Sequence, residues 1–223
     1  MGSGGLVKIT IFSFILFFTG MFFTSCSESE PEITDSVGYV VLDYFSESGT
    51  PSARISVFAE TKSDVHRVDR IQLECVANKH KWICSDPLIF GNEKKQWAGY
   101  TDFYVPVSEN VKSGMYELNY IDAQENVVSR IINLNYDMDF LKMTGNQAAL
   151  AEKKDFREEI AVYSESGTLL FYGMRKNNWR NDSSIFSSNR GAASYRVCYV
   201  SKVNSLVLMM PPVYKNKENK ENK

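Results

Sequence analysis

The fold is decided by one continuous stretch of three segments, Met115-Tyr-Glu-Leu-Asn-Tyr-Ile121, Asp122-Ala-Gln-Glu-Asn126 and Val127-Val-Ser-Arg-Ile-Ile-Asn-Leu134. The two outer segments are rich in Tyr, Val and Ile, which are residues favoured in strands. The segment between them has the polar composition and length of a hairpin loop. The stretch therefore predicts an antiparallel β-hairpin.

More alternating segments precede this hairpin, at 38–45, 54–59, 68–75, 81–84 and 102–107. The clearest is 68–75, in which Ile71, Leu73 and Cys75 fall on one side of an extended chain. Pro106 indicates that the segment 102–107 lies at a sheet edge or contains a bulge. About seven short strands within roughly 100 residues have the spacing of a β-sandwich.

The segment Ser113-Gly-Met-Tyr-Glu-Leu118, followed by the hairpin, resembles the closing strands of immunoglobulin-like and fibronectin type III-like domains. The resemblance covers residues 37–136 and implies a two-sheet sandwich in which Tyr116 occupies the tyrosine-corner position. The chain departs from the antibody pattern because it lacks the Cys…Trp…Cys spacing and has no Trp in 68–75. The resemblance therefore concerns architecture and carries no function.

Residues 137–213 predict a smaller β-rich segment. A short helix is expected from about Asn146, after an interruption at Gly145. Strands are expected at 159–163 and 169–173, a polar loop at 177–184, and a final hairpin at 195–200 and 205–210 that Pro211-Pro212 ends. The low-complexity tail 214–223 predicts disorder. The expected fold class is mostly β, an immunoglobulin-like β-sandwich followed by a smaller β-rich segment with one helix.

The N-terminal region has the pattern of an export signal. Lys8 precedes an apolar run from Ile9 to Phe23, and small residues lead directly to Cys26. The pattern resembles the lipobox of bacterial lipoproteins in its relaxed, spirochaete-type form, with Phe23 where Leu is usual. The resemblance implies that a signal peptide, 1–25, is removed and that Cys26 carries lipid, including palmitate. Residues 26–36 then form an acidic tether.

Three alternatives compete for this N-terminal region. Cytoplasmic myristoylation would need Ser or Thr at position 6, where the chain has Leu6. An ordinary signal peptide would leave Cys26 as a plain thiol, and an uncleaved membrane helix would need about 20 apolar residues, more than Ile9 to Ser25 supplies. We expect the lipid-anchored form, placed on a membrane of the bacterial cell envelope, periplasmic or surface-exposed.

Three cysteines follow Cys26, at positions 75, 84 and 198. Cys75 and Cys84 could form a disulfide across a hairpin, and buried free thiols are the alternative. His66 and His80 lie close to this pair in the sequence, but the C-x4-H-x3-C spacing matches no common zinc motif. We therefore predict no metal site.

Composition and motifs argue against several functions. The formal net charge is −2, so a nucleic-acid partner has no electrostatic support. The sequence contains no Gly-x-Ser-x-Gly elbow, no phosphate-binding Gly loop and only two histidines. We predict a protein that is not an enzyme and that needs no cofactor.

Three tryptophans lie near polar loops and are candidate ligand contacts, Trp82, Trp97 and Trp179. Exposed aromatic rings anchor protein partners or stack on sugars, whereas rings packed in the core do neither. The predicted function is a non-catalytic binding or scaffold module that contacts an envelope protein, and the alternative is a carbohydrate- or peptidoglycan-binding module.

Overall fold

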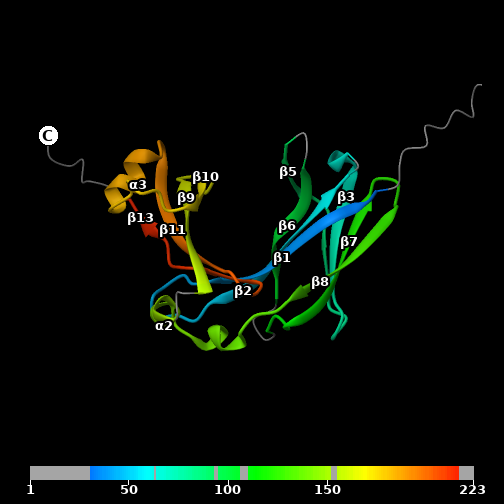
Figure 1. The fold of residues 1–223 in the computed structure, drawn as a ribbon, viewed down its shortest axis with the longest axis horizontal. Coiled ribbons are helices and arrows are strands. Elements are labelled where there is room, and N and C mark those ends of the chain that lie inside the picture. The colour runs from blue at the N-terminus through cyan, green and yellow to red at the C-terminus, as the bar shows by residue number, and fades with distance from the viewer. Residues whose placement is uncertain (1–30, 63, 93–94, 106–109, 152–154, 216–223) are drawn as a thin grey trace, which may run out of the picture. The chain divides into compact units, whose positions relative to one another are not determined.

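The computed structural model describes residues 31–62, 64–92, 95–105, 110–151 and 155–215 (Figure 1). The predicted signal peptide, Cys26 and Pro106 lie outside these ranges, as does the tail beyond Lys215. The described chain belongs to one compact unit that starts at Pro31. Its secondary structure is mostly β, which confirms the predicted class.

Two sheets make up the fold. The smaller has the order β4-β3-β7-β8, and the larger has the order β10-β9-β11-β12-β1-β2-β6-β5, with β13 added beside β11. The strands of the smaller sheet are β3 (Val68–Cys75), β4 (Lys81–Cys84), β7 (Gly114–Asp122) and β8 (Val127–Leu134). Those of the larger sheet are β1 (Ile33–Asp43), β2 (Ser52–Thr61), β5 (Leu88–Gly91), β6 (Gln96–Tyr104), β9 (Phe156–Ser164), β10 (Leu169–Met174), β11 (Ala192–Ser201), β12 (Leu206–Met209) and β13 (Val213–Tyr214).

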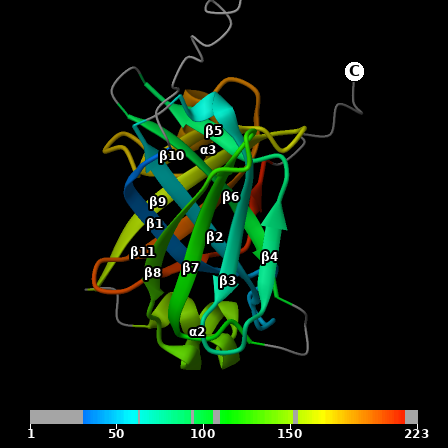
Figure 2. The same cartoon turned by 90° about the vertical axis from the view of Figure 1, so that its right-hand side faces the viewer.

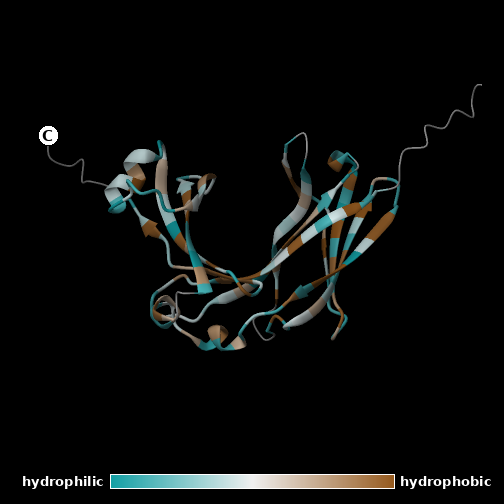
Figure 3. Ribbon diagram, viewed as in Figure 1, coloured by the Kyte–Doolittle hydropathy of each residue, from teal (hydrophilic) through white to brown (hydrophobic). Residues whose placement is uncertain are grey.

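The sandwich forms where β1, β2, β6 and β5 face β4, β3, β7 and β8, which is the pairing of an immunoglobulin-like domain. Figure 2 shows β3 and β7 in front of β1 and β2. Hydrophobic and hydrophilic residues alternate along these strands (Figure 3). Ile55, Ile71 and Leu118 are fully buried between the sheets, and burial of each such side chain is worth roughly 1.5–3 kcal/mol.

The central hairpin and its corner follow the sequence prediction. β7 and β8 pair antiparallel, with Ile121 opposite Val127. Tyr116 is fully buried near the start of β7, and its hydroxyl donates to the carbonyl oxygen of Lys112 at 2.7 Å. This bond to a backbone group just upstream is the geometry of a tyrosine corner.

The segment after residue 136 continues the sandwich sheet. β12 runs parallel to β1, with Val40 opposite Leu206 and Asp43 opposite Met209. β11 pairs antiparallel with both β12 and β9. The larger sheet therefore extends from the sandwich into the C-terminal strands without a break in hydrogen bonding.

One face of the larger sheet is here called the core face. Three groups of elements cover neighbouring parts of it. The smaller sheet packs on β1, β2 and β6, and then η3 (Met138–Lys142) and α2 (Gly145–Leu150) bring Phe140 and Ala148 into the same core. α3 (Asp182–Ser188) packs Ile185 and Phe186 against β9 and β11. The opposite face is here called the outer face.

Several boundaries differ from the prediction. β1 begins at Ile33, so the predicted tether is too long, and Lys215 donates its backbone N–H to Ala193 O at 2.9 Å, so the tail begins later than 214. The prediction missed β5 and the first half of β6. The register of β6 with β2 shifts just after that half, between Tyr100 and Phe103. β13 follows Pro212, at which the prediction ended the last hairpin.

α3 lies in a segment that the sequence predicted as a loop. The Asn181 side chain accepts from the Ser184 N–H at 2.9 Å, and Ser184 Oγ accepts from the Asn181 N–H at 3.1 Å. The polar residues of this segment therefore form a helix cap, and the Asn-x-x-Ser spacing is the signal that could have revealed it.

Candidate functional site

Cys75 and Cys84 are free thiols, so the predicted disulfide alternative is wrong and the free-thiol alternative holds. In the β3–β4 register Cys84 lies opposite Ile71, four residues along the strand from Cys75. At about 3.3 Å per residue this offset is roughly 13 Å, well beyond the Cα separation of about 7 Å that a disulfide can bridge.

The third thiol, Cys198, lies on the outer face of β11 and is buried. Burial raises the pKa of this thiol to about 12, and the nearby charge of Arg196 opposes that rise only in part. Cys198 therefore stays protonated near neutral pH, which is not the state of a nucleophile.

The side chains considered for zinc do not come together. His66 belongs to η2 (Val65–Arg67), before the first residue of β3. Cys75 is the last residue of that strand, and its backbone N–H donates to the carbonyl oxygen of His80. Within the part of the chain that the structure describes, no three His, Cys, Asp or Glu side chains gather to hold a metal ion.

Two of the three candidate tryptophans have structural partners. Trp179 is 2% exposed and packs edge-on against Phe171, with ring centroids 4.8 Å apart, so its prediction as a ligand contact is wrong. Trp82 is half-buried, and its Nε1 donates to Tyr104 O at 2.8 Å, which links β4 to β6 of the other sheet. Its ring also lies 4.2 Å from that of His80.

Trp97 is the candidate that lies in an exposed apolar surface. On the outer face, residues that pair across neighbouring strands form rows, and two adjacent rows bring Trp97 together with other apolar residues. One row contains Trp97 opposite Phe90, and the next contains Leu88, Gly99, Phe58 and Val37. We call Val37, Phe58, Leu88, Phe90 and Trp97 the aromatic patch.

The aromatic patch is exposed and internally packed. Phe90, Leu88 and Val37 are 51%, 48% and 38% exposed. The rings of Phe58 and Phe90 meet edge-on, with centroids 5.0 Å apart and planes inclined at 71°. Apolar residues that gather on the surface in this way mark interaction sites more often than scattered ones do.

A glycine makes the centre of the aromatic patch possible. A Cβ at Gly99 would lie 2.4 Å from Cδ1 of Phe58 and 2.1 Å from the carbonyl oxygen of Val57. The Phe58 ring therefore occupies the space that a side chain at residue 99 would fill. This local packing directs Phe58 towards Phe90 at the sheet edge.

Charged groups border the aromatic patch. Glu60 follows Phe58 by two residues on β2, and its carboxylate pairs with Lys95 Nζ at 3.3 Å. The Lys95 side chain is 63% exposed, whereas that of Glu60 is 13% exposed. An apolar centre with a polar rim is the usual anatomy of a protein–protein interface.

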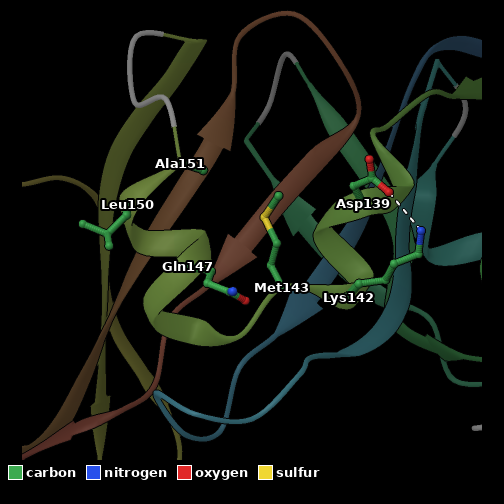
Figure 4. Close-up of a pocket in the computed structure, with 6 residues that line it drawn as sticks. All are labelled: Asp139, Lys142, Met143, Gln147, Leu150 and Ala151. Carbon is green, nitrogen blue, oxygen red and sulfur yellow. Dashed lines mark hydrogen bonds and ion pairs between the residues drawn. The ribbon is translucent and has the colours of Figure 1, made fainter.

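A shallow pocket of about 610 Å³ lies between η3 and α2 (Figure 4). Its lining includes Met143, Leu150 and Ala151, together with an ion pair between Lys142 and Asp139 at 3.0 Å. Both charged side chains are largely exposed, so this pair contributes little binding or stability. The aromatic patch has the larger exposed apolar side chains and is the stronger candidate.

Among the described residues, no helix has both the length and the apolar character needed to cross a membrane.

Known proteins add no family to this description. No protein-family model matches the chain, and no curated protein matches it in sequence.

Proposed function

We propose that this chain is a lipid-anchored protein of the bacterial envelope that binds a partner protein through the aromatic patch and catalyses no reaction. The observation that carries the proposal is the exposure of Phe90 and Leu88 beside Trp97 on one sheet face. Trp and other aromatic residues are enriched in interface cores, where a few of them supply most of the binding energy. The lipobox pattern at Cys26 supports the proposed localisation in the bacterial envelope.

The anchor is tested separately from the patch. Cys26→Ala in the full-length chain should remain uncleaved and take up no labelled palmitate, because the lipid and the cleavage both depend on that residue. The measurement is metabolic labelling followed by a mobility shift of the protein. Normal labelling of the variant would remove the lipoprotein part of the proposal.

The binding surface is tested by affinity capture. Full-length tagged protein is isolated from detergent-solubilised envelope, and defined co-purifying proteins are identified. Phe90→Ala should lose them, because truncation of an interface hot spot costs about 2 kcal/mol or more, roughly 30-fold in affinity. Ile131→Ala is the matched control, since Ile131 is 57% exposed on β8 in the other sheet. Equal capture by both variants would contradict the assignment of the patch.

A glycan-binding module is the second candidate, and the ring geometry favours it less. A sugar platform needs roughly parallel exposed rings, whereas Phe58 and Phe90 are inclined at 71° and Trp179 is buried. Muramidase digestion before capture separates the two functions. Capture that survives digestion supports a protein partner, and capture that disappears supports cell-wall glycan.

A further inference from the structure

The aromatic patch lies beside the end of the larger sheet at which the chain enters it. The first residue of β1 and its partners across the next three strands form the last row at that end, Ile33, Thr61, Gln96 and Gly91. We call these four residues the entry row. Along β1, β2, β5 and β6, every residue of the aromatic patch lies within four residues of the entry row, which is about 13 Å of strand.

The segment between the proposed lipid anchor and the entry row is short. Seven residue steps separate Cys26 from Ile33, and a fully extended chain spans at most about 3.6 Å per residue. The entry row therefore lies within about 25 Å of the lipid-bearing residue, and the aromatic patch lies within about 40 Å of it. The pocket beside α2 is at the far end of β1, because Gly145 and Asn146 of α2 bond to the β1–β2 loop.

Polar and charged groups border the entry row. Lys62 pairs with Glu32 at 2.9 Å, and their side chains are 66% and 60% exposed. The backbone N–H of Val65 donates to Gln96 Oε1 at 3.3 Å, so η2 with its exposed His66 adjoins the same row. Charged side chains are costly to place in the hydrocarbon of a bilayer. This end of the sheet is therefore suited to the hydrated surface of a membrane and not to insertion into lipid.

The aromatic patch faces sideways from this end. Its side chains belong to the outer face of the sheet, and side chains stand roughly perpendicular to the plane of a sheet. Phe90 and Leu88 are about half exposed there, at 51% and 48%. When the entry row is turned towards the membrane, a partner on this face stands beside the chain. Proteins confined to the same membrane meet such a face at a raised effective concentration.

We propose that the partner of the aromatic patch is a protein embedded in the same membrane as the lipid anchor, with an apolar surface within about 40 Å of the lipid. This inference rests on the proposed lipid anchor and on the proposed binding role of the patch. The short segment after Cys26 then acts as a length constraint that keeps the patch and its partner in the same layer.

The first test identifies what contacts the patch in intact cells. The photoreactive amino acid p-benzoylphenylalanine replaces Phe90 in the full-length chain. In the control it replaces Ile131, which is 57% exposed on β8 in the other sheet. Irradiation should join the Phe90 variant to a membrane-spanning protein, which mass spectrometry identifies, and the Ile131 variant should not give this adduct.

The second test changes the length of the segment after Cys26. The photoreactive Phe90 variant receives about 20 additional Gly and Ser residues between Glu30 and Pro31, which form a flexible linker. Effective concentration falls roughly as the −3/2 power of linker length, so the yield of the adduct should fall about sevenfold. The control carries the same insertion after Lys215. Its yield should not change, because the distance between the anchor and β1 stays the same.

The outcomes separate this inference from the proposed function. An adduct with a soluble protein, or an adduct whose yield does not respond to the longer segment, would overturn the inference and leave the patch as a binding surface. The absence of any protein adduct from residue 90, or adducts with lipid alone, would overturn both the inference and the proposed role of the patch.

Discussion

The Tyr116 hydroxyl lies in a core in which its ring is fully buried. Desolvation by burial raises the pKa of this phenol far above its ordinary value, so the hydroxyl stays protonated and donates to Lys112 O. Tyr116→Phe keeps the ring and leaves that carbonyl without its donor. We expect a loss of about 1 kcal/mol in the free energy of unfolding, measured by urea denaturation with an unchanged slope.

The control for this substitution is Tyr104→Phe, because Tyr104 is 56% exposed. It should leave the urea midpoint nearly unchanged. A Tyr116→Phe protein as stable as this control would show that the corner bond contributes nothing.

Tyr116 and Trp179 show which residue roles can be predicted from the sequence. The corner was predictable because Tyr116 lies in the Ser113–Leu118 pattern and bonds to Lys112, only four residues away. The burial of Trp179 was not predictable, because it depends on Phe171 and on the packing of α3 against β9. The polar residues that surround Trp179 in the sequence indicated a loop surface and concealed this packing.

Asp122 holds the turn between β7 and β8. Its carboxylate accepts from the N–H groups of Gln124 and Asn126 at 2.9 Å and pairs with Arg67 at 3.0 Å. Burial pushes the pKa of Asp122 upward, but these hydrogen bonds and the Arg67 charge outweigh it, so the pKa lies below its usual range. The resulting stability is present above the ordinary aspartate pKa of about 3.9 and is lost as the pH falls through the lower folded-state value.

Asp122→Asn should therefore destabilise the fold by about 1.5–3 kcal/mol at pH 7, since it removes charge-assisted bonds to a buried group. The difference from wild type should shrink as the pH falls below about 3.9. Urea unfolding across this pH range is the measurement. Asp69→Asn, at an exposed ion pair, is the control, and an effect of Asp122→Asn that does not vary with pH would contradict the assignment.

At the scale of elements, α2 depends on a close backbone approach. The N–H groups of Gly145 and Asn146 donate to the carbonyl oxygens of Gly49 and Glu47 at 3.1 and 2.8 Å. A Cβ at Gly145 would lie 2.7 Å from Ser46 O. The sequence suggested that Gly145 interrupts a helix, whereas it is the first residue of α2 and allows the helix to contact the β1–β2 loop.

Gly145→Ala sets two effects against each other. Alanine favours a helix by about 1 kcal/mol over glycine, but the contact with Ser46 O forces backbone to move. Overpacking of this kind costs about 1–3 kcal/mol, so we expect net destabilisation in thermal and urea unfolding. Asn146→Ala, at the exposed neighbouring position, should be neutral or slightly stabilising. A more stable Gly145→Ala protein would show that the loop yields easily.

Strands were predicted correctly where apolar and polar residues alternate without interruption. The prediction failed where contacts with distant parts of the chain determine the structure. Ile71 and Leu73 alternate with polar residues, and β3 was predicted at 68–75 as it occurs. β6 begins at Gln96, but its bulge and Gly99 interrupt the alternation. The aromatic patch was only partly predictable for the same reason. Trp97 was a candidate, but Phe58 and Phe90 come from strands that only the tertiary fold places beside it.

At the scale of the whole molecule, the parallel pairing of β1 with β12 joins the sandwich to the C-terminal strands. The change of sequence pattern suggested a boundary between two regions at residue 136. The larger sheet, however, contains strands from both sides of that boundary. Parallel pairing with a distant strand leaves no local signal in the sequence, because β1 and β12 are separated by most of the chain. The two regions should therefore unfold together.

The Asp43 carboxylate is the ionic link across this junction. It accepts from Arg54 Nε of β2 at 2.7 Å and from Arg196 Nη1 of β11 at 2.8 Å, and the three side chains are 6%, 12% and 13% exposed. Arg196 also donates to Met209 O and Met210 O of the β12 region at 2.9 and 2.8 Å. One carboxylate thus pairs with two largely buried guanidinium groups that come from the two ends of the chain, and Arg54 also pairs with Asp102 at 3.3 Å.

Asp43→Asn should cost about 3–5 kcal/mol, because it removes the carboxylate that pairs with Arg196 and one of the two that pair with Arg54, which keeps Asp102. It should also weaken the junction more than either side, so amide hydrogen exchange should accelerate in β11 and β12 before it does in β3 and β7. Asp139→Asn is the control, since its ion pair with Lys142 is exposed and worth little. Asp43→Asn with the stability of that control, or with uniform acceleration of exchange in all four strands, would mean that hydrogen bonding between β1 and β12 holds the two regions together without the ionic link.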